Sequence, residues 1–196
     1  MNKKFITVML PLCLLFGQSD QPELPGWGVY IGGGMVSAGG DSVDFEGVTV
    51  KSLTAFPNIG ITKGVSLGGF PMIVGIGMHK RGYSMEIDFF GEAFTSDVNM
   101  NYLDIWASVP YPVGPVTLNA GFLVGSFLSG TMTILEIDVD MVEGPDALDY
   151  GLLLGVGYPL PIMDNALGLH VGYYLGLADN DGVKFNGLYM NMGYNF

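Results

Sequence analysis

Five ionisable residues stand in segments that are otherwise apolar and rich in glycine: His79, Arg81, Asp104, Asp149 and His170. Within those segments the residues alternate in type, and all five fall on the face of the glycines and polar residues. Such a set predicts either a proton relay along a gated polar pore or an ion-pair network that fills a narrow interior, because charges in a dry interior must be paired. We favour the ion-pair network, since a small barrel is just wide enough for side chains to fill it.

The same residues offer little for metal binding or catalysis. Two histidines and a carboxylate form a conceivable metal site, but the sequence has no close-spaced pair of ligands, so we predict no metal and no cofactor. Lipid-modifying barrel enzymes need a serine and a histidine together at the lipid rim, with an orienting acid or amide. Both histidines are expected to face inward, and no serine stands out beside either. The chain is therefore predicted not to be an enzyme.

A second group of ionisable residues, all acidic, gathers in the predicted connections between strands. A calcium-binding or lipopolysaccharide-bridging surface is one interpretation, because hard cations take several carboxylate oxygens. We favour the other interpretation, a solvated and mutually repulsive surface. A further acidic stretch, residues 179–182, resembles the start of a calcium loop but is predicted to be a turn, since Asp-Gly between two strands favours one. The acidic group comprises Asp41, Asp44, Glu46, Glu136, Asp138, Asp140, Glu143 and Asp146.

The composition indicates a chain whose outside is not everywhere in water. Of 196 residues, 49% are hydrophobic, only 13% are charged and 31 are glycine. A soluble domain carries about 25% charged residues. The length suits one domain rather than two. The net charge of −12 argues against binding to nucleic acid, which attracts basic surfaces.

The first 19 residues have the features of an export signal. Lys3 and Lys4 precede a short apolar stretch, residues 5–16, and small residues follow at a spacing that suits cleavage near Ser19. The apolar stretch is shorter than the roughly 20 residues of a membrane-spanning helix. A lipoprotein site at Cys13 is the alternative, but the bulky residue before it argues against this. We expect residues 1–19 to be a signal peptide and residues 20–196 to be one domain.

Alternation of residue types dominates the rest of the sequence. In a strand, successive side chains point to opposite faces, and here one face is large and apolar while the other is small or polar with almost no charge. A soluble barrel or sandwich would carry charge on its wet face, so we place lipid outside and a narrow interior within. Aromatic residues near strand ends suit the membrane interfaces; they are Trp27, Tyr111, Tyr158 and Phe196. The pattern predicts eight strands: 26–37, 52–63, 70–83, 98–110, 115–128, 147–159, 166–177 and 184–196.

The connections between these strands alternate in length. Short links fall at 66–69, 111–115 and 160–165, and longer ones at 38–51, 84–97 and 129–146, with a medium one at 178–183. Membrane barrels have short periplasmic turns and longer external loops, which predicts that the long links lie outside the cell. In the last long link, apolar residues alternate with acids over 135–141, so a hairpin there is expected to extend beyond the bilayer. We predict an all-β, eight-stranded antiparallel up-and-down transmembrane barrel.

Several stretches resemble one family. Residues 78–82 (MHKRG), 101–105 (NYLDI) and 149–158 (DYGLLLGVGY) are similar to the eight-stranded outer-membrane β-barrel proteins common in Bacteroidetes, called PorT-like or OmpA-type. The resemblance implies a cell outer membrane location in a Gram-negative envelope, and one branch of the family is linked to protein secretion. The last strand also resembles the C-terminal signal read by the barrel-assembly machinery, with Leu188, Met190, Met192, Tyr194 and Phe196 at every second position.

Two functions are compatible with these features. The first is a structural or interaction role in the cell envelope, with a plugged lumen and acidic outer loops. The second is a porin-like small pore, or a barrel that binds and transports a ligand, which the abundance of inward glycine keeps open. Outer-membrane lipid and the assembly machinery are the expected partners, together with an envelope protein that the sequence does not identify.

Overall fold

A computed structural model describes residues 24–196, except residues 45, 90, 91, 136, 142, 143, 145–147 and 181. The predicted signal peptide and the acidic residues Glu136, Glu143 and Asp146 lie outside the described residues. Among the described residues, no helix is long and apolar enough to cross a membrane. A short 3-10 helix, η1 (Met163–Asn165), joins two of the strands. The strands are β1 (Trp27–Gly39), β2 (Val48–Lys51), β3 (Leu53–Leu67), β4 (Phe70–Phe89), β5 (Glu92–Val113), β6 (Val116–Ile134), β7 (Ile137–Met141), β8 (Asp149–Pro159), β9 (Leu167–Gly176) and β10 (Lys184–Asn195).

Eight of these strands close into an antiparallel barrel. The ring runs β1–β3–β4–β5–β6–β8–β9–β10, and β10 pairs with β1 to close it. Closure leaves no unpaired strand edge within the ring, which is the condition for a sheet to stand in lipid. The predicted fold class is therefore confirmed. The remaining strands add to the ring at one end, where β2 pairs with β4 and β7 pairs with β6.

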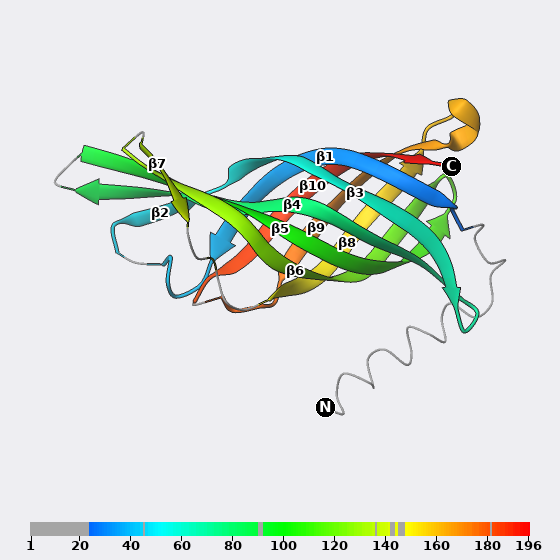
Figure 1. The fold of residues 1–196 in the computed structure, drawn as a ribbon, viewed down its shortest axis with the longest axis horizontal. Helices are drawn as coiled ribbons and strands as arrows, with labels where there is room; N and C mark the ends of the chain where they lie inside the picture. Colours follow the sequence, from blue (N-terminus) through cyan, green and yellow to red (C-terminus); the bar gives the residue numbers. More distant parts are fainter. Residues whose placement is uncertain are drawn as a thin grey trace.

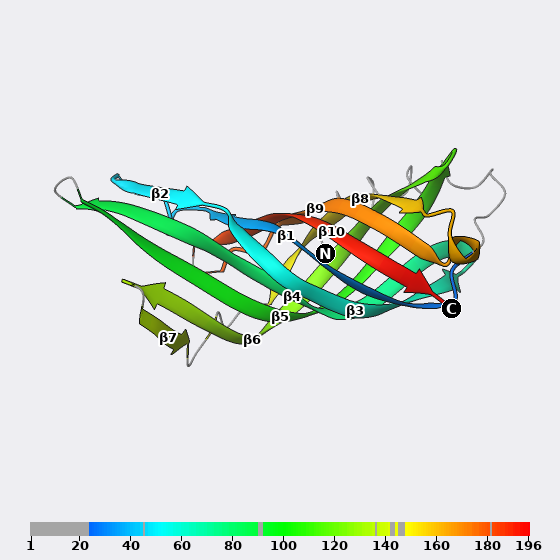
Figure 2. The ribbon, with the colours of Figure 1, turned by 90° about the horizontal axis from the view of Figure 1, so that it is seen from above.

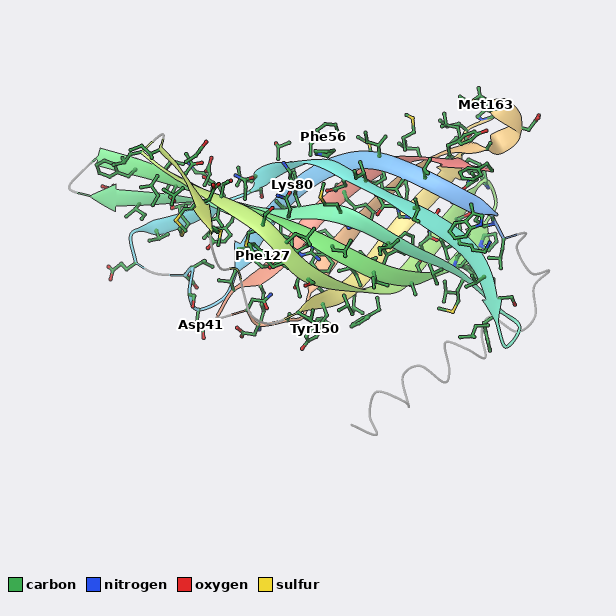
Figure 3. The ribbon with its side chains drawn as sticks, in the orientation of Figure 1. Asp41, Phe56, Lys80, Phe127, Tyr150 and Met163 are labelled. Atoms are coloured by element: carbon green, nitrogen blue, oxygen red, sulfur yellow. The ribbon has the colours of Figure 1, made fainter. Side chains whose placement is uncertain are left out.

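The outward face of the barrel is apolar, as the alternation predicts. On β10 and at Phe196 directly after it, the large residues of the predicted assembly signal are all exposed. Phe56 and Tyr150 likewise project away from the barrel on opposite sides (Figure 3). Such a surface is stable against hydrocarbon and not against water, so it marks the lipid-facing belt.

One end of the barrel, the inner end, has tight turns. Gly68 and Gly69 turn between β3 and β4 with φ of 59° and 87°, and Gly114 turns between β5 and β6 with φ of 60°. Two-residue hairpins need such positive φ values, which glycine adopts without strain. The four aromatic residues predicted for an interface lie here and are exposed. The Lys63 ammonium lies 4.3 Å from the Trp27 ring. We call this end periplasmic because outer-membrane barrels keep their short turns there.

The opposite, outer end is asymmetric. β4 and β5 pair as far as Phe89 and Glu92, well beyond the ends of β8, β9 and β10 (Figures 1 and 2). The prediction of a long link at 84–97 was therefore wrong: most of it is strand. Antiparallel pairing continues past the lipid because it satisfies backbone groups in water as well, while the apolar alternation that marked the strand ends at the membrane. The predicted hairpin over 135–141 is present, with Ile134 opposite Ile137.

Candidate functional site in the barrel interior

A buried ion-pair network around Arg81 occupies the interior of the outer half. Arg81, on β4, donates from Nη1 and Nη2 to Asp104 on β5, at 3.1 and 3.0 Å, and from Nε to Asp149 on β8. The Tyr174 hydroxyl on β9 donates to Asp149 at 2.8 Å. Arg81 is 3% exposed, and both carboxylates are 0% exposed. We call these four residues the Arg81 network; it joins four strands across the lumen.

Aromatic and apolar side chains enclose this network. The guanidinium carbon of Arg81 lies 4.3 Å from the Tyr102 ring centroid and 5.1 Å from that of Tyr174. Such cation–π contacts add to the ion pairs where water is excluded. Tyr102 also belongs to a buried apolar cluster, in which its ring meets Phe127 edge-on and tilts against Phe185. The cluster comprises Ala38, Val98, Met100, Tyr102, Leu123, Tyr174 and Phe185.

His79 links the Arg81 network to the inner half of the lumen. Its Nδ1 lies 2.6 Å from Asp104 Oδ2, and its Nε2 lies 2.8 Å from the Tyr30 hydroxyl. An ionised carboxylate only accepts hydrogen bonds, so Nδ1 donates to Asp104, and in the neutral imidazole Nε2 accepts from Tyr30. A continuous series of hydrogen bonds therefore runs from Tyr30 through His79 and Asp104 to Arg81.

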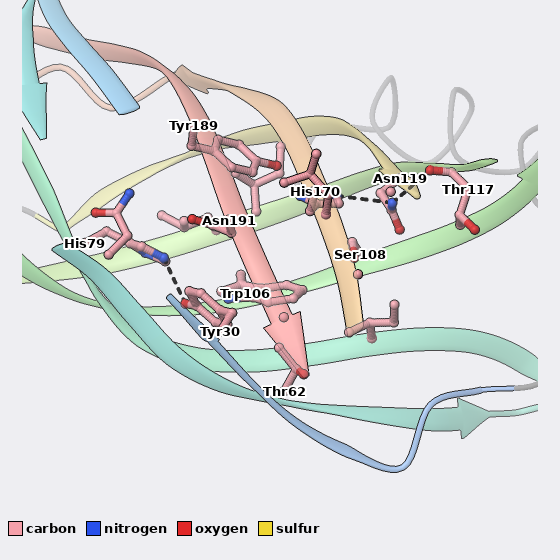
Figure 4. A pocket seen from close by; sticks show the side chains of 18 of the residues that line it. Tyr30, Thr62, His79, Trp106, Ser108, Thr117, Asn119, His170, Tyr189 and Asn191 are labelled. Atoms are coloured by element: carbon pink, nitrogen blue, oxygen red, sulfur yellow. Dashed lines mark hydrogen bonds between the residues drawn. The ribbon is translucent and has the colours of Figure 1, made fainter. Parts of the chain in front are cut away.

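The structure brings together His79, Arg81, Asp104 and Asp149 but not the fifth ionisable residue singled out from the sequence. His170, on β9, has the inward parity expected of it, yet lies nearer the inner end. Its Nε2 is 3.2 Å from Asn119 Nδ2, and its ring stacks on Tyr189 with centroids 5.5 Å apart. His170 thus belongs to a separate polar group (Figure 4).

Inward glycines act as sockets for large inward side chains of neighbouring strands. A Cβ added at Gly77 would lie 2.2 Å from the Tyr30 hydroxyl, and one at Gly75 would lie 2.4 Å from the Trp106 ring. The rings therefore rest directly on the backbone of the barrel wall. Gly172 receives Tyr189 in the same way, Gly155 receives His170, Gly151 receives Tyr174 and Gly125 receives Asp104. The glycine-rich face predicted from the sequence thus allows large side chains to fit inside a narrow barrel.

A cavity of about 820 Å³ occupies the inner half of the lumen. Its lining reaches the inner rim at Pro25 and Phe196, and at the other end it includes Arg81, Tyr174 and Phe185. Amide, hydroxyl and aromatic side chains line it in between (Figure 4); they include Thr62, Trp106, Ser108, Asn119, Tyr189 and Asn191. Three inward glycines here are not sockets, because a Cβ added at Gly157, Gly168 or Gly193 would lie 3.5 Å or more from any neighbour.

The described residues form no grouped metal site, and the Gly-x-Ser-x-Gly pattern of the sequence lies in a hairpin. Within the described ranges, no three residues among His, Cys, Asp and Glu are grouped to hold a metal ion. The turn predicted at residues 179–182 is present, where the Gly182 amide donates to Asp179 Oδ1 at 2.7 Å. A Gly-x-Ser-x-Gly pattern occurs at 64–68, but Ser66 is exposed in a β-hairpin, opposite Pro71. A nucleophile elbow instead requires a strand-to-helix turn.

Sequence reasoning missed three residues that shape the interior: Tyr30, Tyr102 and Trp106. Each has inward parity, since Val29 and Ile31 flank Tyr30 on the outward face and Trp106 follows Asp104 by two positions. The alternation of the sequence therefore already placed these three aromatic residues on the inward face. It was weak because aromatic residues also occupy outward positions at the interfaces.

Solved structures share this fold at low sequence identity. Neisserial surface protein A is 13% identical, with a TM-score of 0.56 over 89% of this chain and 99% of that chain. Ail, the attachment invasion locus protein of Yersinia pestis, is 14% identical, with a TM-score of 0.47 over 88% of this chain and 99% of that one. No protein-family model and no curated protein sequence matches the chain. The fold is that of the eight-stranded outer-membrane β-barrels of Gram-negative bacteria, and the outer membrane is the location that its apolar belt requires.

Proposed function

We propose that the chain is a non-conducting outer-membrane barrel with an interaction role in the cell envelope. The observation that carries this proposal is the Arg81 network, whose charged residues are at most 3% exposed and which joins four strands across the lumen. An ion crossing the barrel would have to displace buried, mutually paired charges, which costs several kcal/mol. The apolar cluster beside the network presents a second barrier, because most of its side chains offer an ion no polar groups.

Conductance in a planar lipid bilayer tests the closed lumen. The purified, folded barrel is expected to leave the bilayer insulating at neutral pH and moderate voltage, while a general porin inserted under the same conditions gives steady open levels. A steady open level from this chain would overturn the proposal. It would favour the second candidate, a small transport pore, for which the 820 Å³ cavity at the inner end is the supporting observation.

The interaction role rests on the sheet that protrudes from the outer end. This sheet consists of β2, the ends of β4, β5 and β6, and β7, and among the described residues β7 pairs with β6 alone. An unpaired edge strand offers backbone donors and acceptors to a partner strand. On β7 the exposed residues Ile137 and Val139 alternate with Asp138 and Asp140. A partner is expected to add a strand there and to bring apolar or basic side chains.

Site-specific photocrosslinking in cells tests the docking edge. A photoreactive residue at Val139 is expected to give a discrete protein adduct, and the same residue at Leu118, on the lipid-facing side of β6, is expected to give none. The adduct should disappear when a proline at position 138 or 140 removes a backbone donor from β7 while the barrel stays folded. Adducts that are equal at both positions, or unaffected by proline, would contradict an edge-strand interaction.

Two narrower assignments from the sequence belong to the same proposal. The first is membership of the PorT-like branch common in Bacteroidetes, for which the stretches at 78–82, 101–105 and 149–158 are the support. The second is recognition of β10 by the barrel-assembly machinery, supported by the outward row from Leu188 to Phe196. Replacing Phe196 with serine is expected to lower the amount of assembled barrel in the outer membrane, and unchanged assembly would contradict this recognition.

A further inference from the structure

The cavity in the inner half of the lumen has the shape of a binding site rather than of a packing defect. At about 820 Å³ it falls within the range of about 300–1,000 Å³ that is usual for small-molecule sites. At its outer end the lining includes Arg81, Asp104 and Tyr174 of the Arg81 network, and at the inner end it reaches the rim. The open glycines Gly157, Gly168 and Gly193 keep it empty, where bulkier residues would have filled it as they fill the outer half.

The charged and polar residues that line the cavity argue against charged ligands and against purely aliphatic ones. Of the charged residues along it, Arg81 and Asp104 are paired with each other, Asp164 stands at the rim, and Lys80 has the outward parity of β4. A charged ligand would therefore lose its hydration without gaining a counter-charge. A purely aliphatic ligand would cover amide and hydroxyl groups without replacing their hydrogen bonds, which is also costly.

Aromatic rings supply the remaining part of the site. Ring atoms of Trp106 lie beside Gly75 of the wall, and the hydroxyl end of Tyr189 lies beside Gly172 while its ring stacks on His170. A ring held in this way offers its electron-rich face to polarised C–H groups. Aromatic faces beside uncharged amides and hydroxyls suit a neutral ring compound that carries many hydroxyl groups.

We propose that the inner half of the lumen binds a neutral saccharide, which enters from the periplasmic end. Ring faces of the sugar stack on Trp106 and Tyr189, and its hydroxyl groups exchange hydrogen bonds with Asn119, Asn191 and Ser108. The Arg81 network forms the closed end of the site, so the saccharide is held there and does not pass through. This proposal does not depend on the partner proposed for the outer sheet.

The two tryptophans of the chain make the test direct, since Trp27 lies on the outside and Trp106 in the cavity. In a Trp27→Phe variant in phospholipid micelles, without scaffold protein or sugar detergents, all tryptophan emission comes from Trp106. Maltotriose, cellotriose and N,N′-diacetylchitobiose are the probes, with glucuronic acid as the charged comparison. At least one neutral probe is expected to give a saturable change in emission with a Kd of about 1 mM or tighter, and to protect Trp106 from quenching by acrylamide.

Variants that fill the cavity locate the site. Gly193→Leu and Gly168→Leu each place a side chain in the open space and are expected to abolish the response, whereas Ala120→Leu adds the same side chain to the lipid-facing side of β6 and leaves it unchanged. Retained mobility shifts on heating show that each variant is folded. Failure of all three neutral probes to change or protect Trp106 emission overturns the proposal. Binding that survives in a folded cavity-filled variant, or an equal response to glucuronic acid, overturns it as well.

Discussion

The two halves of the lumen share a wall and differ in what fills it. In the outer half, Arg81, Asp104 and Asp149 are sealed among aromatic rings with at most 3% exposure. In the inner half, Gly157 and Gly193 face open space, and the polar groups surround an 820 Å³ cavity. The strands run through both halves with the same alternation of large outward and small inward residues. The outward residues therefore set the location in the membrane, and the few large inward residues decide which part of the interior is filled by side chains.

Inward glycines have opposite consequences at different positions, although the backbone pattern is the same. Gly125 and Gly151 lie under Asp104 and Tyr174, so the space left by the missing side chain is taken by a neighbour. At Gly168 no neighbour takes it, and the space becomes cavity. A glycine-rich inward face is thus compatible with a tightly packed interior and with an open one. Neighbours across the sheet decide between the two.

The largest effect is expected from removing the cation of the filled half. Arg81→Met leaves Asp104 and Asp149 buried and close together without a counter-charge, which costs about 3–5 kcal/mol for a broken buried pair. Urea unfolding of the barrel in detergent micelles, followed by tryptophan emission, is expected to shift to lower urea by a corresponding amount. The folded fraction should also lose its resistance to heating on a gel.

A neutral version of the network is the matched control for that change. In the triple variant Arg81→Met, Asp104→Asn and Asp149→Asn no charge is left unpaired, so much of the lost stability is expected to return. If the triple variant were less stable than Arg81→Met alone, the buried carboxylates would not be the source of the destabilisation. The stability that the filled outer half contributes would then come from side-chain packing rather than from the pairing of charges.

The sequence was enough to predict the strands of the barrel and which side chains face inward. It was not enough to predict which of those side chains contact one another. All five ionisable residues face inward, as alternation dictates. Which of them meet depends on register: Asp104 stands opposite Gly77 and Gly125, and a bulge at Asn101 and Tyr102 shifts the pairing above it. Alternation repeats every two residues, so it does not say which residues of two neighbouring strands lie opposite each other. His170 has the same parity as Asp149 and Arg81 but a different height, and this is why it falls outside the network.

The protruding sheet was underestimated from the sequence for a related reason. The apolar alternation that reveals a strand exists because one face meets lipid, and beyond the bilayer both faces meet water. Glu86 and Thr95, which are paired across β4 and β5, carry no such signal. The 135–141 hairpin was found because its residues still alternate between acids and apolar side chains. A strand outside the membrane can be predicted from the sequence only where its apolar and polar residues still alternate.

The two kinds of inward glycine are expected to differ when the same side chain is added to each. Gly75→Val places its Cβ about where the Trp106 ring lies, at 2.4 Å, and overpacking of this kind costs about 1–3 kcal/mol. Gly193→Val has no neighbour closer than 3.6 Å and is expected to leave the stability nearly unchanged. Urea midpoints of the two variants measured side by side give the comparison. Equal destabilisation would mean that the space beside Gly193 is as tightly filled as the space that the Trp106 ring takes beside Gly75.

The smallest effect is expected from an ion pair that lies outside the lumen. Lys51 Nζ on β2 is 2.5 Å from Glu86 Oε2 on β4, with side chains 53% and 37% exposed. Solvent screens this pair and two long side chains must be ordered to form it, so Lys51→Met should cost between about 0.2 and 1 kcal/mol. Its effect should shrink further when salt is raised, whereas the effect of Arg81→Met should not, because buried charges are screened much less. A loss at Lys51 as large and as insensitive to salt as the loss at Arg81 would show that burial is not what separates the two ion pairs.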